Sequence, residues 1–158
     1  MRRFILTKIV IFGGESDIAS AIKEIEPNTI NISYAECDVT DSNSIRECLE
    51  HHQPTAVVNC AGVSNVQLIK DSDIELWEKE INVNLIGSYR IARECANLGI
   101  MDMVFIASVA GKYGKPEHSG YCASKCGTIS LVQSLAFEGY NAYAVSPGRV
   151  DTKMREND

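Results

Sequence analysis

The residues best suited to chemistry are a tyrosine and a lysine four positions apart, with a serine upstream. Tyr121 and Lys125 stand at i and i+4 in a segment with helical spacing, so both side chains lie on one helix face. A free tyrosine titrates at about pH 10, so it is a useful base at neutral pH only when a nearby cation favours the phenolate. Ser108 follows an apolar run, where its hydroxyl is suited to hydrogen-bond a carbonyl oxygen. The three residues together predict hydride transfer to or from a carbonyl.

A glycine-containing turn follows the first apolar run of the chain. The segment Gly13-Gly14-Glu15-Ser16-Asp17-Ile18-Ala19 leads directly into helical spacing. Backbone N–H groups and the helix dipole at such a turn can hold a pyrophosphate. The pattern keeps only the first glycines of a dinucleotide-binding fingerprint, because Asp17 and Ala19 stand where the fingerprint has glycine. An ordinary strand-to-helix turn is therefore the alternative.

Strand-like and helical segments alternate along the chain. Apolar, β-branched runs predict strands at 8–12, 29–34, 56–60, 103–108 and 142–146, and helical periodicity predicts helices at 17–25, 44–51, 73–97 and 119–137. Ser44 and Ser72 each precede a glutamate by three residues, which is the spacing of a capping box. The alternation predicts an α/β fold, a Rossmann-like doubly wound parallel sheet with helices on both faces. Ligands of such sheets bind beyond the carboxyl ends of the strands, where Ser108 and the glycine turn lie.

Composition indicates one soluble domain over residues 1–158. The chain carries 15 Lys and Arg against 21 Asp and Glu, a net charge of −6. This acidic balance disfavours nucleic acid as a partner, because the phosphate backbone is bound by clustered Lys and Arg. The longest unbroken apolar run, 103–107, is far shorter than the roughly 20 residues of a membrane span. Neither nucleic acid nor a membrane is an expected partner.

The N-terminus and the cysteines predict a cytoplasmic protein. Residues 1–8 are basic and then apolar, but Lys8 interrupts the apolar stretch and no small-residue cleavage site follows. The six cysteines form no CxxC pair and lie within apolar segments. We therefore expect reduced, mostly buried thiols and no metal site.

In their order along the chain, these motifs resemble those of the short-chain dehydrogenase/reductase family. The phosphate loop of the family resembles 13–19, its Asp-Val pair resembles Asp38-Val39, and its Asn-Asn-Ala-Gly motif resembles Asn59-Cys60-Ala61-Gly62. Its catalytic asparagine, serine and Tyr-x-x-x-Lys pair match Asn84, Ser108, Tyr121 and Lys125. Its nicotinamide-holding segment is similar to Pro147-Gly148 with Val150 and Thr152. The resemblance covers nearly the whole chain.

The resemblance implies an NAD(P)-dependent oxidoreductase acting on a small-molecule carbonyl or secondary alcohol. Tyr121 would be the general acid/base, Lys125 would lower its pKa and bind the nicotinamide ribose, and Ser108 would orient the carbonyl. Asn84 would position a water that relays protons to Lys125. The implied cofactor-binding residues are Gly13, Glu15, Ser16, Asp17, Ile18, Asp38, Val39, Asn59, Ala61, Gly62, Tyr121, Lys125, Pro147, Gly148, Val150 and Thr152. Glu15 and Asp38 would repel a 2′-phosphate, which favours NAD over NADP.

The sequence also departs from the family. Asp38 lies only 19 positions after Ala19, where the family has an additional strand and helix, so we expect fewer strands. The family continues beyond the Pro-Gly segment with a substrate-covering loop, a helix and a strand, whereas this sequence ends at Asp158. These differences predict a pocket that is open or covered by another chain. An NAD(P)-binding protein without turnover, regulatory or relic, is the alternative to an enzyme.

Three further expectations concern surfaces. The resemblance implies a homodimer or homotetramer formed through the helices 73–97 and 119–137. Lys79, Arg90 and Arg93 with their neighbouring glutamates predict a solvated helix face. His118 precedes Tyr121 by three residues, but a loop histidine of this kind is more often solvated than functional.

Overall fold

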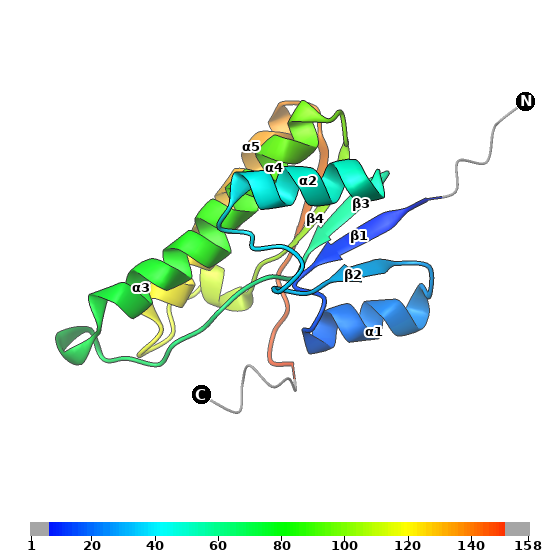
Figure 1. Cartoon of the computed structure of the whole chain (residues 1–158). Helices are drawn as coiled ribbons and strands as arrows, with labels where there is room; N and C mark the ends of the chain where they lie inside the picture. Colours follow the sequence, from blue (N-terminus) through cyan, green and yellow to red (C-terminus); the bar gives the residue numbers. More distant parts are fainter. Residues whose placement is uncertain (1–6, 151–158) are drawn as a thin grey trace, which may run out of the picture.

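The computed structural model describes residues 7–150, in which strands and helices alternate along the chain (Figure 1). The strands are β1 (Ile9–Phe12), β2 (Ile30–Ile32), β3 (Ala56–Asn59), β4 (Asp102–Ile106) and β5 (Asn141–Val145). The α-helices are α1 (Asp17–Ile25), α2 (Ser42–His52), α3 (Ile74–Glu80), α4 (Gly87–Asn97) and α5 (Ser119–Phe137). Short helical segments are η1 (Ile69–Asp71), η2 (Ile81–Ile86) and η3 (Val109–Gly111). None of the helices in this range is long and apolar enough to cross a membrane.

The five strands form one parallel sheet in the order β2-β1-β3-β4-β5. Every neighbouring pair is parallel, and Phe12 of β1 pairs with Ile32 on one side and Asn59 on the other. The chain order reverses between β1 and β3, which makes this the switch point where open α/β sheets bind ligands. The predicted α/β architecture is confirmed, with fewer strands than the family that it resembles.

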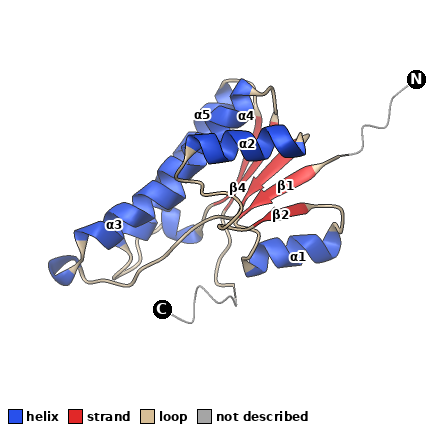
Figure 2. Ribbon diagram, in the orientation of Figure 1, coloured by secondary structure: helices blue, strands red, loops and turns tan. Residues whose placement is uncertain are grey.

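The helices cover the two faces of the sheet unequally (Figure 2). On one face, alternate strand residues such as Phe12 and Phe105 pack with α2, α4 and α5 in a single buried core. On the other face, α1 covers β1 and β2, and Asn31 of β2 donates a hydrogen bond to the Ala19 carbonyl of α1. The last strand of the sheet carries two largely exposed apolar side chains, Tyr143 at 62% and Val145 at 46%. Helices therefore lie on both faces, but β5 is only partly covered.

The expected capping serines do not begin their helices. Asp41 is the N-cap of α2 and accepts from the Asn43 N–H, and Asp73 is the N-cap of α3 and accepts from the Glu75 N–H. The capping boxes predicted at Ser44 and Ser72 are therefore wrong. A carboxylate is the stronger acceptor at the positive end of a helix dipole, so the aspartate directly before each helix takes this position.

The long helix expected at 73–97 is continuous but not uniformly α-helical. Its central segment, η2, is π-helical, and it separates α3 from α4. A π segment inserts one residue into a helix and is frequent at functional sites. Here it contains Asn84, which is only 1% exposed.

The solvated face expected along this helix is wrong for two of its glutamates. Glu80 is 2% exposed and Glu94 is fully buried. The Arg46 guanidinium of α2 contacts Glu94 at 3.0 Å, which holds the pKa of that carboxyl below its usual range and joins α2 to α4. Both carboxylates are buried because each meets donors from another part of the chain, which helical spacing alone does not reveal.

Candidate active site

A pocket of about 1390 Å³ opens at the carboxyl ends of β1, β3 and β4. This size accommodates a dinucleotide together with a small second ligand, since drug-sized ligands occupy roughly 300–1,000 Å³. Most of the predicted site residues line it, namely Gly13, Glu15, Ser16, Asp17, Ile18, Asp38, Val39, Ala61, Gly62, Ser108, Tyr121, Lys125, Pro147, Gly148 and Val150. Asn59 and Asn84 are buried behind the wall, and Thr152 lies outside the described residues.

The glycine turn after β1 approaches the backbone after β3. Gly13 has a φ of +70°, and a Cβ atom at this position would collide with the backbone of Ala61. The Asn59 carboxamide fixes the other side of this contact by accepting from the Ala61 N–H at 3.0 Å. Ser16 caps α1 by accepting from the Ala19 N–H at 3.2 Å. The first turn of α1 thus begins at the pocket wall, as a pyrophosphate-binding turn requires.

The expected adenosine end of the pocket is acidic. Asp38 Oδ1 accepts from the N–H and the hydroxyl of Thr40, both at 2.8 Å, and Oδ2 accepts from the Tyr34 hydroxyl at 3.4 Å. These contacts hold the carboxylate at the pocket wall with one oxygen less occupied. Lys23, the nearest lysine along the chain, instead donates to the Thr29 carbonyl before β2, at the opposite end of that strand.

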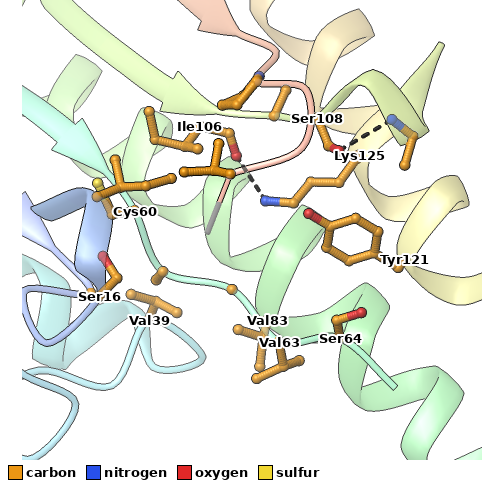
Figure 3. A pocket seen from close by; sticks show the side chains of 18 of the residues that line it. Ser16, Val39, Cys60, Val63, Ser64, Val83, Ile106, Ser108, Tyr121 and Lys125 are labelled. Atoms are coloured by element: carbon orange, nitrogen blue, oxygen red, sulfur yellow. Dashed lines mark hydrogen bonds between the residues drawn. The ribbon is translucent and has the colours of Figure 1, made fainter. Parts of the chain in front are cut away.

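Lys125 is a buried cation beside the Tyr121 ring (Figure 3). Its side chain is drawn into the pocket wall, where Nζ donates to the Ile106 carbonyl at 2.7 Å and lies 5.6 Å from the centre of the Tyr121 ring. Burial lowers the pKa of Lys125 from 10.5 to about 8, against a smaller opposite effect of the Cys60 thiol. Lys125 therefore carries its charge at neutral pH in a place where that charge is poorly solvated. Such a cation favours a phenolate next to it.

Ser108 presents its hydroxyl to the same cavity (Figure 3). Its Oγ atom accepts from the Ala110 N–H at 3.1 Å and thereby caps η3. Because that bond uses an acceptor lone pair, the hydroxyl proton is directed elsewhere. In this geometry Ser108 can donate to an oxygen placed near Tyr121.

Asn84 is bonded on every polar atom of its carboxamide. Its Oδ1 accepts from the Val63 N–H at 2.8 Å, and its Nδ2 donates to the Val63 carbonyl at 2.9 Å and to the Ser124 hydroxyl at 3.0 Å. Ser124 in turn donates to the Tyr121 carbonyl at 2.8 Å. Asn84 thus joins the loop after β3 to the start of α5. Its Oδ1 and the Lys125 ammonium also face the same side of Gly62.

His118 is buried at 4% exposure and lines the pocket, so the expectation of a solvated loop histidine is wrong. Its Nδ1 lies 2.8 Å from the Pro116 carbonyl and its Nε2 lies 2.8 Å from the Lys115 ammonium. The exposed cations Lys79, Lys115 and Arg149 also line the pocket.

All six cysteines are free, and only Cys126 is exposed. Cys60 lies at the pocket wall near Ser16, and burial raises the pKa of its thiol to about 11. Within residues 7–150, no group of three or more His, Cys, Asp or Glu side chains is placed to hold a metal ion.

Sequence reasoning missed several residues of this site. Lys79 was assigned to a solvated face, and neither Lys115 nor Arg149 had a motif to single it out. Glu80 was missed as well, although it contacts the first turn of α5. Its spacing of three residues from Trp77 was the one available indication that it faces inward.

This fold defines a doubly wound α/β protein with a pocket at the carboxyl ends of its strands, and the comparisons identify its family. The family model described as short chain dehydrogenase matches residues 6–158. The chain is 30% identical to 3-oxoacyl-[acyl-carrier-protein] reductase MabA of Mycobacterium tuberculosis, in an alignment that covers 96% of this chain and 72% of that protein. The chain therefore belongs to the short-chain dehydrogenase/reductase family.

Other relatives carry different substrate names. A human (3R)-3-hydroxyacyl-CoA dehydrogenase is 30% identical, with 80% of this chain and 54% of that protein covered. The ligand-free aldohexose dehydrogenase of Thermoplasma acidophilum superposes with a TM-score of 0.81 at 25% identity, covering 94% of this chain and 69% of that chain. A Burkholderia cenocepacia short chain dehydrogenase in complex with NADP shares the fold, with a TM-score of 0.80 at 16% identity over 96% and 76% of the two chains.

Proposed function

We propose that this protein transfers hydride between a nicotinamide dinucleotide and a carbonyl or secondary alcohol. The observation that carries the proposal is the buried Lys125 ammonium, 5.6 Å from the centre of the Tyr121 ring, in the wall of a pocket that Ser108 also lines. A buried cation is unfavourable for folding, so its presence beside a phenol argues for a chemical purpose. The collision that a Cβ at Gly13 would make with Ala61 supports a dinucleotide cradle in the same pocket.

Each chain residue has a defined part in the proposed reaction. In the direction of reduction, Tyr121 gives its phenolic proton to the substrate oxygen, and Lys125 stabilises the phenolate that remains. Ser108 donates a hydrogen bond to the same oxygen and stabilises it as negative charge develops. Asn84 holds the loop at Val63 and, through Ser124, the start of α5. The nicotinamide supplies or accepts the hydride when it is bound.

Cofactor binding and turnover, each measured on the wild type and on two variants, test this function. NADH and NADPH binding is measured by calorimetry, and a panel of ketones and secondary alcohols is then screened by the absorbance of the reduced nicotinamide. Tyr121→Phe is expected to abolish nearly all turnover and to leave cofactor affinity unchanged, because the ring still packs. Lys125→Ala is expected to damage both. Equal turnover by Tyr121→Phe and the wild type would refute the mechanism.

The rival function is cofactor binding without turnover. The same screen separates the two, because a binding protein gives a calorimetric signal with NADH and converts no carbonyl or alcohol. The joint presence of Asn84, Ser108, Tyr121 and Lys125 around one cavity favours the enzyme.

We further propose that NAD is preferred over NADP. In the half of the pocket formed by β1, α1 and the loop after β2, the charged wall residues among those described are Glu15, Asp17 and Asp38, all acidic. A ribose 2′-hydroxyl can donate to the Asp38 carboxylate, whereas a 2′-phosphate would be repelled by it. Tighter binding of NADPH than of NADH would contradict this preference.

A homo-oligomer formed through the long helices also remains a proposal. What supports it is the exposure of large apolar side chains there, with Tyr89 of α4 at 50% and Phe137 of α5 at 94%. Light scattering at micromolar concentration is expected to give the mass of at least two chains.

A further inference from the structure

Glu80 is a buried carboxylate that the proposed reaction does not yet use. It is the last residue of α3, and it is 2% exposed. Its Oε1 accepts from the Asn65 N–H at 2.7 Å. Burial raises the pKa of Glu80, and three effects oppose it: a hydrogen bond from the Asn65 N–H, the charge of the nearby His118 and a hydrogen bond from the Tyr121 N–H. A buried carboxylate is costly unless its surroundings compensate it, so these two N–H groups and His118 explain why it is tolerated.

The second of these donors belongs to the proposed acid/base residue. The N-cap of α5 is His118, whose side chain makes no capping hydrogen bond, so the first-turn N–H groups of the helix need another acceptor. Glu80 supplies it from α3, and a negative charge at this end of a helix is also favoured by the helix dipole. The approach is close, because a Cβ at Gly120 would collide with Oε2 of Glu80.

Glu80 and Asn84 act on the same two segments. They lie four residues apart, and both reach from the long helix to the loop after β3 and to α5. Asn84 holds Val63 and, through Ser124, the Tyr121 carbonyl. Glu80 holds Asn65 and the Tyr121 N–H. The Tyr121 N–H is therefore hydrogen-bonded to Glu80, and the Tyr121 carbonyl is hydrogen-bonded to Ser124, which Asn84 contacts. Glu80 and Asn84 both belong to the long helix.

We propose that Glu80 is a positioning residue for Tyr121, which fixes the proton-transferring phenol and the loop 63–65 relative to each other. The proposal rests on the hydride-transfer function proposed above. Because Glu80 is not among the residues that line the pocket, its effect reaches the substrate through the placement of Tyr121. Its loss should then lower the rate of the chemical step more than the affinity for the cofactor.

Glu80→Gln is the most informative variant, since it keeps the size of the side chain. Its amide oxygen can still accept from one N–H, but its NH₂ group then faces the other N–H as a second donor. Glu78→Gln is the matched control, because Glu78 is exposed two residues earlier on the same helix. Gly120→Ala perturbs the same contact from the side of α5 and serves as a second variant.

Two readouts are measured on folded wild type and variants. Amide hydrogen exchange by mass spectrometry reports residues 63–66 and 119–123, and single-turnover absorbance of NADH reports the hydride step. For Glu80→Gln we expect faster exchange in both segments, a hydride step slower by roughly tenfold or more, and a cofactor Kd within about twofold of wild type. Glu78→Gln should match the wild type in all three.

The outcomes separate this proposal from the proposed function. Unchanged exchange in both segments, or an unchanged hydride step in an active enzyme, would overturn the positioning role. A parallel loss of hydride transfer and of cofactor affinity would indicate a general structural role and would also overturn it. If the wild type converts no carbonyl, the proposed function fails, and the exchange data alone decide whether Glu80 joins the two segments.

Discussion

Replacing Lys125 by methionine is expected to stabilise the protein while destroying the proposed activity. Burial lowers the pKa of Lys125 from 10.5 to about 8, which corresponds to about 3 kcal/mol of unfavourable charge burial at neutral pH. Methionine fills the same space without a charge. The Ile106 carbonyl loses the hydrogen bond from Nζ, which costs about 1 kcal/mol. The free energy of unfolding should therefore rise by about 2 kcal/mol, which raises Tm by roughly 4–8 °C in a domain of this size.

The pH dependence tests the cause of this gain. The unfolded state binds the Lys125 proton more tightly than the folded state, so wild-type stability rises with pH between about 8 and 10.5. Lys125→Met lacks this component, and its advantage should shrink across the same window. Urea unfolding at pH 7 and at about pH 9.5 measures both effects. Lys112→Met, at an exposed position, is the control and should change stability by less than about 0.5 kcal/mol.

Two results would refute the reasoning. If Lys125→Met is less stable than the wild type at pH 7, the buried ammonium is not a net cost to folding. If both proteins gain stability equally between pH 7 and about 9.5, Lys125 does not titrate in that window. Either result would also remove the argument that this lysine is kept for chemistry.

The remaining predictions concern the substrate, the cofactor and assembly. Ser108→Ala should lower kcat by on the order of 10²-fold in the NADH absorbance assay with an unchanged cofactor Kd, and a loss below tenfold would contradict its role at the oxyanion. Asp38→Ser should shift the calorimetric affinity ratio toward NADPH by on the order of tenfold, since it removes a repelling charge. Carbonyl substrates that bear a carboxylate should have lower KM values than their amides, and Lys79→Gln with Lys115→Gln should raise KM severalfold for the acid alone. Tyr89→Asp should convert an oligomer to a monomer in light scattering, if α4 forms the contact.

The sequence was sufficient for the architecture because the strands of a parallel sheet read as short apolar runs. Each of the five predicted strands overlaps an observed strand, and α5 begins and ends where its periodicity predicts. The wrong capping predictions are those in which a neighbouring residue takes the position that a short-range sequence rule assigns to another residue. Ser44 had the spacing of a cap, but Asp41 provides the cap, and the Ser44 hydroxyl accepts from the Asp38 N–H instead.

The motif residues of the site could be predicted from the sequence, but the residue proposed to position them could not. Tyr121, Lys125 and Ser108 follow recognisable spacings, and each reaches the same cavity. Glu80 has no motif, because its role depends on the Asn65 and Tyr121 N–H groups, which lie 15 residues before it and 41 residues after it in the sequence. Contacts of this range follow from the packing of α3 against α5, which helical periodicity alone does not specify.

Three buried polar residues gather at one place in the fold. Glu80, Asn84 and Lys125 are each buried at 5% exposure or less, and each is bonded to the backbone of a segment that lines the pocket. These residues come from the long helix and α5, next to the ends of β3 and β4, whereas β2 and β5 form the outer edges of the sheet. A sheet with fewer strands than the rest of the family can therefore still support the complete cluster. Buried polar groups cost stability wherever they occur, so the gathering of these three around one pocket argues that they are kept for the chemistry proposed there.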